Sequence, residues 1–299
     1  MQIDKRIILC YNCRTEFVVY GMPHTAFLGA FELEKRANLR IVVKVGTSTL
    51  TRENGALNLH NMDHLARALS DLHGMGHEVI LVSSGAIGVG TGKLGLSERP
   101  KELRMKQAVA AVGQCELMHL YDKFFGEYGN TVAQILLTGE DVEDAVRSEH
   151  LANTFSSLLE LGCIPVVNEN DSVSSAEIET GKCKVLGDND TLSAIVARLC
   201  KADLLVLLSD IDGLYTADPH KDSNAVLIER VEAITPELKA MAGGAGTWRG
   251  TGGMATKLTA AEIAMGAGVD MVITNGSNME ALYDIVDGKP IGTRFCAQK

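Results

Sequence analysis

Residues 39–50 read LRIVVKVGTSTL, and this stretch decides the fold. The run from Ile41 to Val45 is β-branched except at Lys44, which is typical of a strand buried in a parallel sheet. A strand covered on both faces rarely carries a charge. In one interpretation, Lys44 serves a phosphate site with Gly46–Ser48, whose amides and hydroxyls can approach phosphate oxygens closely. In the other, the strand lies at a sheet edge and Lys44 extends its charged end into water.

Length, composition and charge narrow the possible functions. The 299 residues suffice for one large α/β domain or two small ones, and 46% hydrophobic content supports a substantial core. The net charge of −10 argues against general nucleic-acid affinity, so an anionic substrate needs local positive charge. No stretch reaches 18 apolar residues, so we expect no membrane span. Seven scattered cysteines favour a reducing, cytoplasmic setting, and Cys10 and Cys13 lack the second pair that would indicate zinc.

Apolar runs alternate with helix-like segments from Arg40 onward. The predicted strands are Ile41–Val45, Val79–Val82, Thr131–Leu137, Cys163–Val167, Leu204–Leu208 and Val269–Thr274, with an edge strand at Val226–Val231. The predicted helices are Leu59–Gly74, Lys101–Phe125, Glu143–Leu161, Thr191–Cys200 and Gly253–Gly266. Repeated βα units predict a mostly parallel sheet between helix layers. The polar alternation from Ser172 to Leu186 predicts a projecting β-hairpin.

Polar or glycine-rich sequence follows five of the predicted strands. These strand ends are Gly46–Ser48, Ser83–Ala86, Asn168–Asp171, Ser209–Gly213 and Asn275–Ser277. In an open parallel sheet, ligands bind beyond the carboxyl ends of the strands. Five such ends in one chain therefore predict a single site at one edge of the sheet.

Two of these ends suggest a zwitterionic substrate. Ser84–Ala86 enters a helix, where free amides and the helix dipole favour an anion, although a plain N-cap explains the same residues. Asn168 and Asn170 can accept and donate hydrogen bonds and Asp171 can accept them, which together suits a ligand with an ammonium and a carboxylate. The alternative for this run is an ordinary turn.

Two further stretches could handle phosphate. Asp188 and Asp190 precede an apolar helix, and either could cap it or could orient lysines in a nucleotide enzyme. We favour helix capping and catalysis equally for Asp188, and catalysis for Asp190. The loop Thr251–Lys257 is glycine-rich and ends in a lysine on the first turn of the next helix. It matches neither a Walker A sequence nor G-x-G-x-x-G, and a flexible loop with a solvated lysine is the competing interpretation.

In chain order, six short stretches together resemble the glutamate 5-kinase branch of the amino acid kinase family. They are Val43–Ser48, Ser83–Ala86, Asn168–Asp171, Gly187–Asp190, Gly213–Thr216 and Gly250–Lys257. The resemblance runs from Arg40 to Phe295. It implies a three-layer α/β/α sandwich with a central, mainly parallel sheet, and places the kinase domain at 39–299. Residues 1–38 are then an N-terminal extension of unknown structure, and no C-terminal PUA-type domain is expected.

The resemblance also implies an activity and a set of site residues. The activity is ATP-dependent phosphorylation of the γ-carboxylate of L-glutamate to L-glutamyl 5-phosphate, the first step of proline biosynthesis, with Mg²⁺. By resemblance, Lys44 and Lys257 stabilise the transferring phosphoryl group, and Asp190 holds both lysines in place. The resemblance implies that glutamate is bound by Ser84, Asp171, Asn189 and Asn168. It implies that ATP is bound by Lys44, Ser209, Asp210, Thr251, Gly252, Gly253, Met254, Ala255, Thr256 and Lys257. No residue is expected to bind metal directly.

The resemblance extends to partners and leaves alternatives open. It implies proline as a feedback inhibitor, a homo-oligomer (dimer or tetramer) and functional coupling to glutamyl phosphate reductase, with no nucleic acid and no membrane. The segment Glu177–Gly187 is longer than the commoner family spacing, which leaves substrate closure and regulation open. The enzyme alternative is a sister kinase acting on acetylglutamate, aspartate, carbamate or a nucleoside monophosphate. A catalytically silent metabolite sensor on the same fold is the alternative outside enzymes.

Overall fold

The computed structural model describes residues 38–52, 56–173, 188–217, 219, 222, 224–242 and 253–297. The sheet and its covering helices belong to the unit Leu39–Lys299. The predicted N-terminal extension lies outside the described residues, apart from Asn38. So does the predicted hairpin, apart from Ser172 and Val173 at its start, which lie in a turn.

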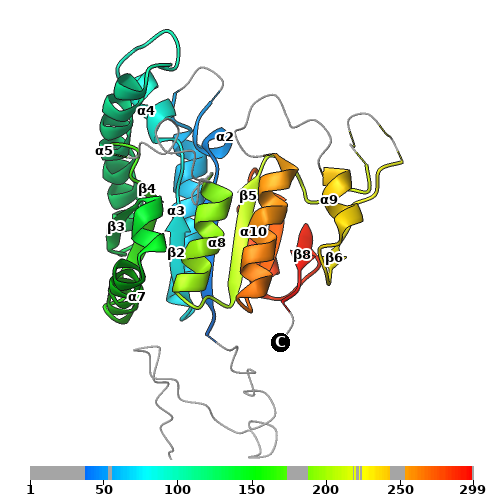
Figure 1. Cartoon of the computed structure of the whole chain (residues 1–299). Helices are drawn as coiled ribbons and strands as arrows, with labels where there is room; N and C mark the ends of the chain where they lie inside the picture. Colours follow the sequence, from blue (N-terminus) through cyan, green and yellow to red (C-terminus); the bar gives the residue numbers. More distant parts are fainter. Residues whose placement is uncertain are drawn as a thin grey trace, which may run out of the picture. The chain divides into compact units, whose positions relative to one another are not determined.

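One sheet of eight strands forms the centre of the unit (Figure 1), in the order β3-β4-β2-β1-β5-β7-β8-β6. The strands are β1 (Arg40–Val45), β2 (Glu78–Val82), β3 (Val132–Leu137), β4 (Ile164–Glu169), β5 (Leu204–Ser209), β6 (Arg230–Val231), β7 (Asp270–Asn275) and β8 (Thr293–Phe295). Every neighbouring pair is parallel except β7 with β8. The predicted mainly parallel sheet is therefore confirmed.

The strand that carries Lys44 lies in the middle of this sheet. In β1, Lys44 pairs with Val82 of β2 on one side and with Leu207 of β5 on the other. The interpretation of β1 as an edge strand is therefore wrong. A lysine in a central strand must end at a polar partner or at a ligand, because both faces of the strand are covered by helices.

Helices cover both faces of the sheet and give the expected three layers. Figure 1 shows α8 (Asn189–Leu199) and α10 (Met254–Gly266) across one face, with α3 (Leu59–Gly74) behind the sheet. Each face of the sheet has its own hydrophobic core. The first core, on the face of α8 and α10, includes residues of α7 (Ala145–Glu160). The second core, on the face of α3, includes residues of α5 (Leu103–Glu127) and α11 (Ala281–Val286). The shorter helices are α2 (Thr47–Leu50), α4 (Ala86–Lys93), α6 (Gly139–Glu143) and α9 (Pro236–Ala242).

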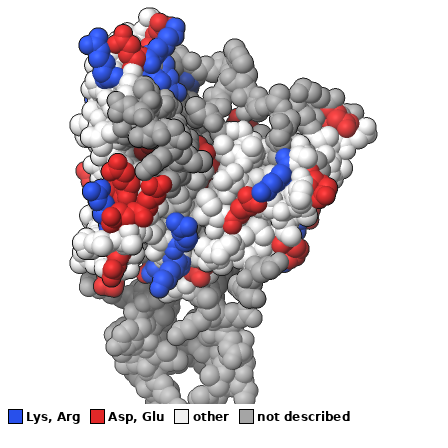
Figure 2. Space-filling model, in the orientation of Figure 1, with Lys and Arg blue, Asp and Glu red and all other residues white. Residues whose placement is uncertain are grey.

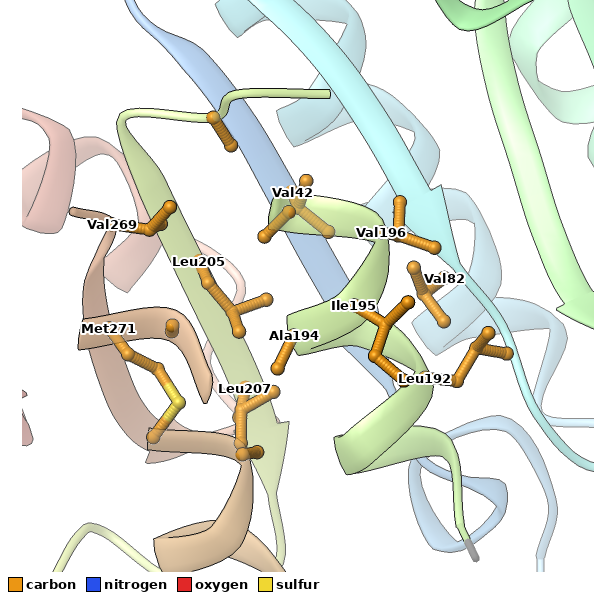
Figure 3. Close-up of a cluster of buried hydrophobic side chains, with 14 of the residues drawn as sticks. Val42, Val82, Leu192, Ala194, Ile195, Val196, Leu205, Leu207, Val269 and Met271 are labelled. Atoms are coloured by element: carbon orange, nitrogen blue, oxygen red, sulfur yellow. The ribbon is translucent and has the colours of Figure 1, made fainter. Parts of the chain in front are cut away.

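Alternate strand residues supply the two cores, as the period of a strand requires. Val42 and Val82 face α8 in the first core, where Ile195 and Val196 pack against them (Figure 3). Val43 lies in the second core. Lys44 follows the alternation of Val42, so its side chain leaves β1 on the face that α8 and α10 cover.

Three element boundaries differ from prediction for identifiable reasons. The predicted helix Glu143–Leu161 is α7, which begins at Ala145 because Asp144 is extended and its side chain accepts a bond from the amide of Arg147, whereas Glu143 ends α6. Helix α8 begins at Asn189 rather than at Thr191, because the side chain of Asp188 caps its first turn. The predicted edge strand at Val226–Val231 is reduced to β6. Strand β8 and helices α9 and α11 carried no signal strong enough to predict.

Helices α4 and α5 pack with their backbones in contact. A Cβ atom on Gly113 of α5 would lie 1.8 Å from the carbonyl oxygen of Ala86, the first residue of α4. A Cβ atom on Gly90 of α4 would lie 2.0 Å from the carbonyl oxygen of Val109. Only glycine permits this approach, and it fixes α5 directly over the start of α4. The end of β2, which leads into α4, is thereby held against α5.

We expect Gly113→Ala to lower the free energy of unfolding by about 2 kcal/mol or more, because the methyl group forces the two helices apart. The control is Gly126→Ala in the same helix, where an added Cβ meets nothing within 4 Å. That change should stabilise the protein by about 0.5–1 kcal/mol through helix propensity. Thermal and urea unfolding followed by circular dichroism measures both, and equal midpoints for the two variants would contradict the packing argument.

Candidate active site

Two lysines from distant parts of the chain meet on one carboxylate. Lys44 of β1 places Nζ 2.6 Å from Oδ1 of Asp190, and Lys257 of α10 places Nζ 3.0 Å from its Oδ2. Asp190 lies in the first turn of α8. The hydroxyl of Thr256 adds a hydrogen bond of 3.2 Å to Oδ2. Both carboxylate oxygens therefore have a cationic partner.

These three charges are largely removed from water. The side chain of Asp190 is 2% exposed, that of Lys257 is 7% exposed and that of Lys44 is 12% exposed. Burial alone would raise the pKa of Asp190, but the ammonium groups of Lys44 and Lys257 outweigh it and hold the pKa below its ordinary value of 3.8. Asp190 is thus ionised at neutral pH. The group carries one net positive charge at the edge of the sheet.

Helix termini add to this positive region. Helices α8 and α10 each precede a parallel strand, so their N-termini lie at the carboxyl edge of the sheet, where α4 also begins after β2. Asp188 is the N-cap of α8 and accepts from the amides of Asp190 at 2.8 Å and Thr191 at 3.0 Å. Helix capping, one of the two interpretations weighed for Asp188, is confirmed. At α8 these two amides are therefore already taken by a carboxylate, whereas the starts of α4 and α10 have no side-chain cap, and free amides at such termini favour an anionic ligand.

The start of α10 carries most of the predicted nucleotide loop. Gly253 is the extended N-cap residue, and Met254, Ala255, Thr256 and Lys257 form the first turn. The hydroxyl of Thr256 also donates to the carbonyl of Gly253 at 2.8 Å, which ties the cap to the turn. Thr251 and Gly252 lie outside the described residues. The predicted position of Lys257 on the first helical turn is confirmed.

Ser209 and Asp210 end β5 beside the central strand. Ser209 is 8% exposed and donates to Oδ1 of Asp210 at 3.1 Å, whereas Asp210 itself is exposed. Among the described residues, Asp210 makes no hydrogen bond or ion pair with the two lysines or with Asp190. Its carboxylate is therefore open to the space beyond the strand ends.

A second group of polar side chains gathers at the ends of β2 and β4. The hydroxyl of Ser84 donates to the carbonyl of Val45 at 3.0 Å and lies 3.4 Å from that of Thr47. Asn189, next to Asp190 on α8, donates to the carbonyl of Ser83 at 2.8 Å and to Oδ1 of Asn168 at 3.2 Å. Val45 follows Lys44 in the chain, and Asn189 precedes Asp190. These bonds therefore link Ser84 and Asn168 to neighbours of the buried ion pairs.

Asp171 lies apart from these contacts. Its half-buried position raises the pKa of its carboxyl group, and the guanidinium of Arg99 acts in the opposite direction. A cation bound at Asp171 would stabilise the charged form further and lower its pKa. Among the described residues, Asp171 makes no hydrogen bond with Ser84, Asn168 or Asn189.

Sequence reasoning missed the contribution of α5 to this edge. Oε1 of Gln114 accepts from the amide of Asn168 at 2.9 Å, and the hydroxyl of Tyr121 lies 2.8 Å from that of Ser83. Gln114 and Tyr121 are seven residues apart and share one helix face. In the sequence alone, this spacing indicates only that the face packs on the core. At the end of β7, the side-chain amide of Asn275 donates to Oδ1 of Asp212 at 2.8 Å. Among the described residues, Asn275 makes no hydrogen bond with Lys44, Lys257 or Asp190.

The described residues contain no group of three or more His, Cys, Asp or Glu side chains arranged to hold a metal ion. Asp190 is committed to two lysines and is a poor metal ligand for that reason.

Within the described part of the chain, no helix is long and apolar enough to cross a membrane. The face in Figure 2 shows Lys and Arg interspersed with Asp and Glu. The two lysines of the site, Lys44 and Lys257, are buried.

We expect Asp190→Asn to lower the free energy of unfolding at pH 7 by about 3 kcal/mol or more, because two buried ammonium groups lose their counter-charge. The pKa of Asp190 is depressed in the folded state, so its contribution is present above the ordinary value of 3.8 and is lost as the pH falls through the folded pKa. The difference between wild type and Asp190→Asn should therefore shrink below about pH 4.

Urea unfolding between pH 3 and pH 7 measures this difference. Asp122→Asn, an exposed carboxylate on α5, is the control and should have little effect at any pH. A destabilisation by Asp190→Asn that stays constant down to pH 3 would show that the ion pairs are not its cause.

Comparison with known proteins places this arrangement in a family. The sequence model of the amino acid kinase family matches residues 39–275. The glutamate 5-kinase of Clostridium perfringens is 56% identical over 260 residues, which are 87% of this chain and 96% of that protein. The glutamate 5-kinase of Clostridium tetani is 59% identical over 259 residues, 87% of this chain and 95% of that protein.

Solved structures agree at the level of the fold. Isopentenyl phosphate kinase from T. acidophilum has a TM-score of 0.58 at 18% identity, covering 86% of this chain and 99% of that one. UMP kinase from Bacillus anthracis has a TM-score of 0.58 at 14% identity, covering 87% and 96%. The three-layer fold, the matched residues and the high identity to the two clostridial enzymes lead to one conclusion: the chain belongs to the amino acid kinase family.

Proposed function

We propose that this chain transfers the γ-phosphoryl group of ATP to the γ-carboxylate of L-glutamate, giving L-glutamyl 5-phosphate for proline biosynthesis. The observation that carries the proposal is the buried group in which Asp190 holds Lys44 at 2.6 Å and Lys257 at 3.0 Å. The glutamate 5-kinases that are more than half identical to this chain support the choice of acceptor.

In this proposal the two lysines stabilise the charge on the transferring phosphoryl group. Phosphoryl transfer is catalysed mainly by positioning and by electrostatic stabilisation, and cations in a water-poor site act more strongly than in bulk water. Asp190 keeps both ammonium groups at fixed positions. Amides at the start of α10, together with Ser209 and Asp210, bind ATP.

The chemistry needs no general base. A γ-carboxylate is already ionised at neutral pH, because its ordinary pKa is about 4.3. Asp190 would be a poor base, since both of its oxygens bind lysines and its pKa is depressed. A carboxylate oxygen of the acceptor attacks the γ-phosphorus, the bond to the bridging oxygen breaks, and ADP leaves. The site therefore suits an acceptor that arrives without a proton to lose.

Mg²⁺ in this proposal arrives with the nucleotide. The described side chains offer no cage of carboxylates, and Mg²⁺ in kinase sites usually keeps water and phosphate oxygens as ligands. It would supply charge neutralisation between the phosphates. Asp210 is exposed just after β5 ends, and in this proposal its carboxylate faces such a complex.

The glutamate subsite is assigned to Ser84, Asp171, Asn168 and Asn189. Ser84 precedes the start of α4, where free amides suit a carboxylate, and Asp171 supplies a negative charge for an ammonium. Proline shares the carboxylate and the cationic nitrogen but lacks the γ-carboxylate, so it would inhibit by occupying the same subsite. Homo-oligomerisation, coupling to glutamyl phosphate reductase and a cytoplasmic location belong to the same proposal.

A hydroxamate assay tests the proposed function, because hydroxylamine traps acyl phosphates. Purified protein is incubated with MgATP and, separately, with glutamate, acetylglutamate, aspartate, carbamate and UMP. Glutamate-dependent hydroxamate and ADP should form, with little product from the other acceptors. ADP formation with UMP or acetylglutamate but not glutamate would favour a sister kinase, and the absence of turnover with every acceptor would favour a sensor.

We expect Lys44→Ala and Lys257→Ala each to lower kcat by about 10²-fold or more, the usual effect of losing one preorganised electrostatic group. Each variant should still fold, because Asp190 keeps the other lysine. Lys123→Ala, an exposed lysine on α5, is the control and should retain full activity. Initial rates at saturating substrates give kcat, and a Lys44 or Lys257 variant with nearly normal kcat would remove that lysine from the mechanism.

We expect Asp171→Ala to raise KM for glutamate by about tenfold or more while KM for ATP stays within about twofold, because a charge-assisted bond to the ammonium is lost. The inhibition constant for proline should rise in parallel. Initial rates against glutamate at several proline concentrations measure both constants, and wild-type inhibition should be competitive or sigmoidal. Inhibition that added glutamate cannot relieve would argue for a separate proline site.

A further inference from the structure

A row of three side-chain amides links α5 to the proposed glutamate subsite. The amide nitrogen of Asn168 donates to Oε1 of Gln114 at 2.9 Å, and the amide nitrogen of Asn189 donates to Oδ1 of Asn168 at 3.2 Å. Asn168 is 2% exposed, so the middle of this row is screened from water. Gln114 follows Gly113, whose backbone contact with α4 places this part of α5 against the strand ends.

Two backbone groups fix the orientation of these amides. The N–H of Glu169 can only donate, and it lies 2.9 Å from the Asn168 atom that must therefore be the oxygen. The carbonyl of Ser83 can only accept, and it lies 2.8 Å from the Asn189 atom that must therefore be the nitrogen. Turning either amide over would bring two donors or two acceptors together. Gln114 completes the row by accepting the remaining bond from Asn168.

This orientation decides what Asn189 offers to a ligand. The amide nitrogen of Asn189 has two hydrogens, and the carbonyl of Ser83 and Oδ1 of Asn168 take one each. Among the described residues, none donates a hydrogen bond to Oδ1 of Asn189. Asn189 begins α8 at the ligand edge of the sheet, directly before Asp190. With both hydrogens of its nitrogen engaged, Asn189 has only its oxygen to offer a ligand at that edge, and a ligand group that meets this oxygen must be a donor.

We propose that Gln114 is a positioning residue that acts through Asn168 to hold Oδ1 of Asn189 toward the α-ammonium of the amino-acid substrate. This inference rests on the proposed function and deepens it. An ammonium group gains a charge-assisted hydrogen bond from such an oxygen. An amide turned the other way would set an NH₂ donor against the cation. The row therefore contributes to selection of substrates with a free amine.

Two substitutions of Gln114 separate its hydrogen bond from its packing. Gln114→Leu removes the acceptor and keeps a good helix former of similar size. Gln114→Glu keeps an oxygen that accepts from Asn168. Cys115→Ala, an exposed neighbour on α5, is the control for a change in this helix.

We expect Gln114→Leu to raise KM for glutamate about tenfold, with kcat and KM for ATP within about twofold of wild type, as for the loss of one hydrogen bond to a charged group. Gln114→Glu should restore KM to within about threefold of wild type, and Cys115→Ala should not differ from it. The preference for glutamate over glutarate, which lacks the amine, should fall in Gln114→Leu and persist in Gln114→Glu. Initial rates by ADP release give all of these values.

The wild-type acceptor is established first, and that step tests the proposed function separately. If another amine-bearing acceptor is used instead of glutamate, the same four proteins are compared with it, and the same KM pattern supports the role of Gln114. A preferred acceptor without a free amine overturns that role. Equal losses in Gln114→Leu and Gln114→Glu, or a joint loss of kcat and ATP affinity, overturn it as well. If Gln114→Leu does not fold, Gln114→Met replaces it, and the same outcomes apply.

Discussion

Asp190 holds Lys44 and Lys257 through its two carboxylate oxygens, and the site depends on this buried contact. The three residues come from β1, α8 and α10, so one carboxylate ties the central strand to the two helices that cover it. Two lysines this close would repel each other without it. The ion pairs fix the positions of both cations before any ligand arrives, which is the condition for strong electrostatic stabilisation of a transferring phosphoryl group.

The charge of the site is local and opposite in sign to that of the whole chain. The chain carries a net charge of −10, whereas Lys44, Lys257 and Asp190 together carry +1 in a region largely closed to water. In such a region the interaction with phosphate is screened little by solvent. An acidic protein can therefore bind ATP without a basic surface. The N-terminus of α10, which has no side-chain cap, reinforces the same sign of potential at the same edge.

The proposed acceptor side of the site also depends on backbone packing. Gly90 and Gly113 let α4 and α5 approach until their backbones touch, and this contact sets where α5 lies over the ends of β2 and β4. From that position Tyr121 reaches Ser83, and Gln114 reaches Asn168. A substitution distant from both substrates, such as a change at Gly113, can for this reason alter the geometry of the subsite as well as the stability of the protein.

The sequence alone predicted strands β1 to β5 and β7, their order along the chain and the polar residues at most of their ends, whereas β8 carried no local signal. Apolar runs of strand length and helical spacing are local patterns, but Lys44 within such a run left two interpretations open, a phosphate site and an edge strand with its lysine in water. The resemblance implied that Asp190 holds Lys44 and Lys257, and the tertiary structure shows these contacts. The tertiary structure also decided between the two interpretations of Asp188 and showed the contribution of Gln114. These contacts join residues that are far apart in the chain or depend on where a helix begins. A half-buried glutamine on a long helix has no local pattern that separates a packing role from a positioning one, and only the neighbours brought to it by the fold distinguish them.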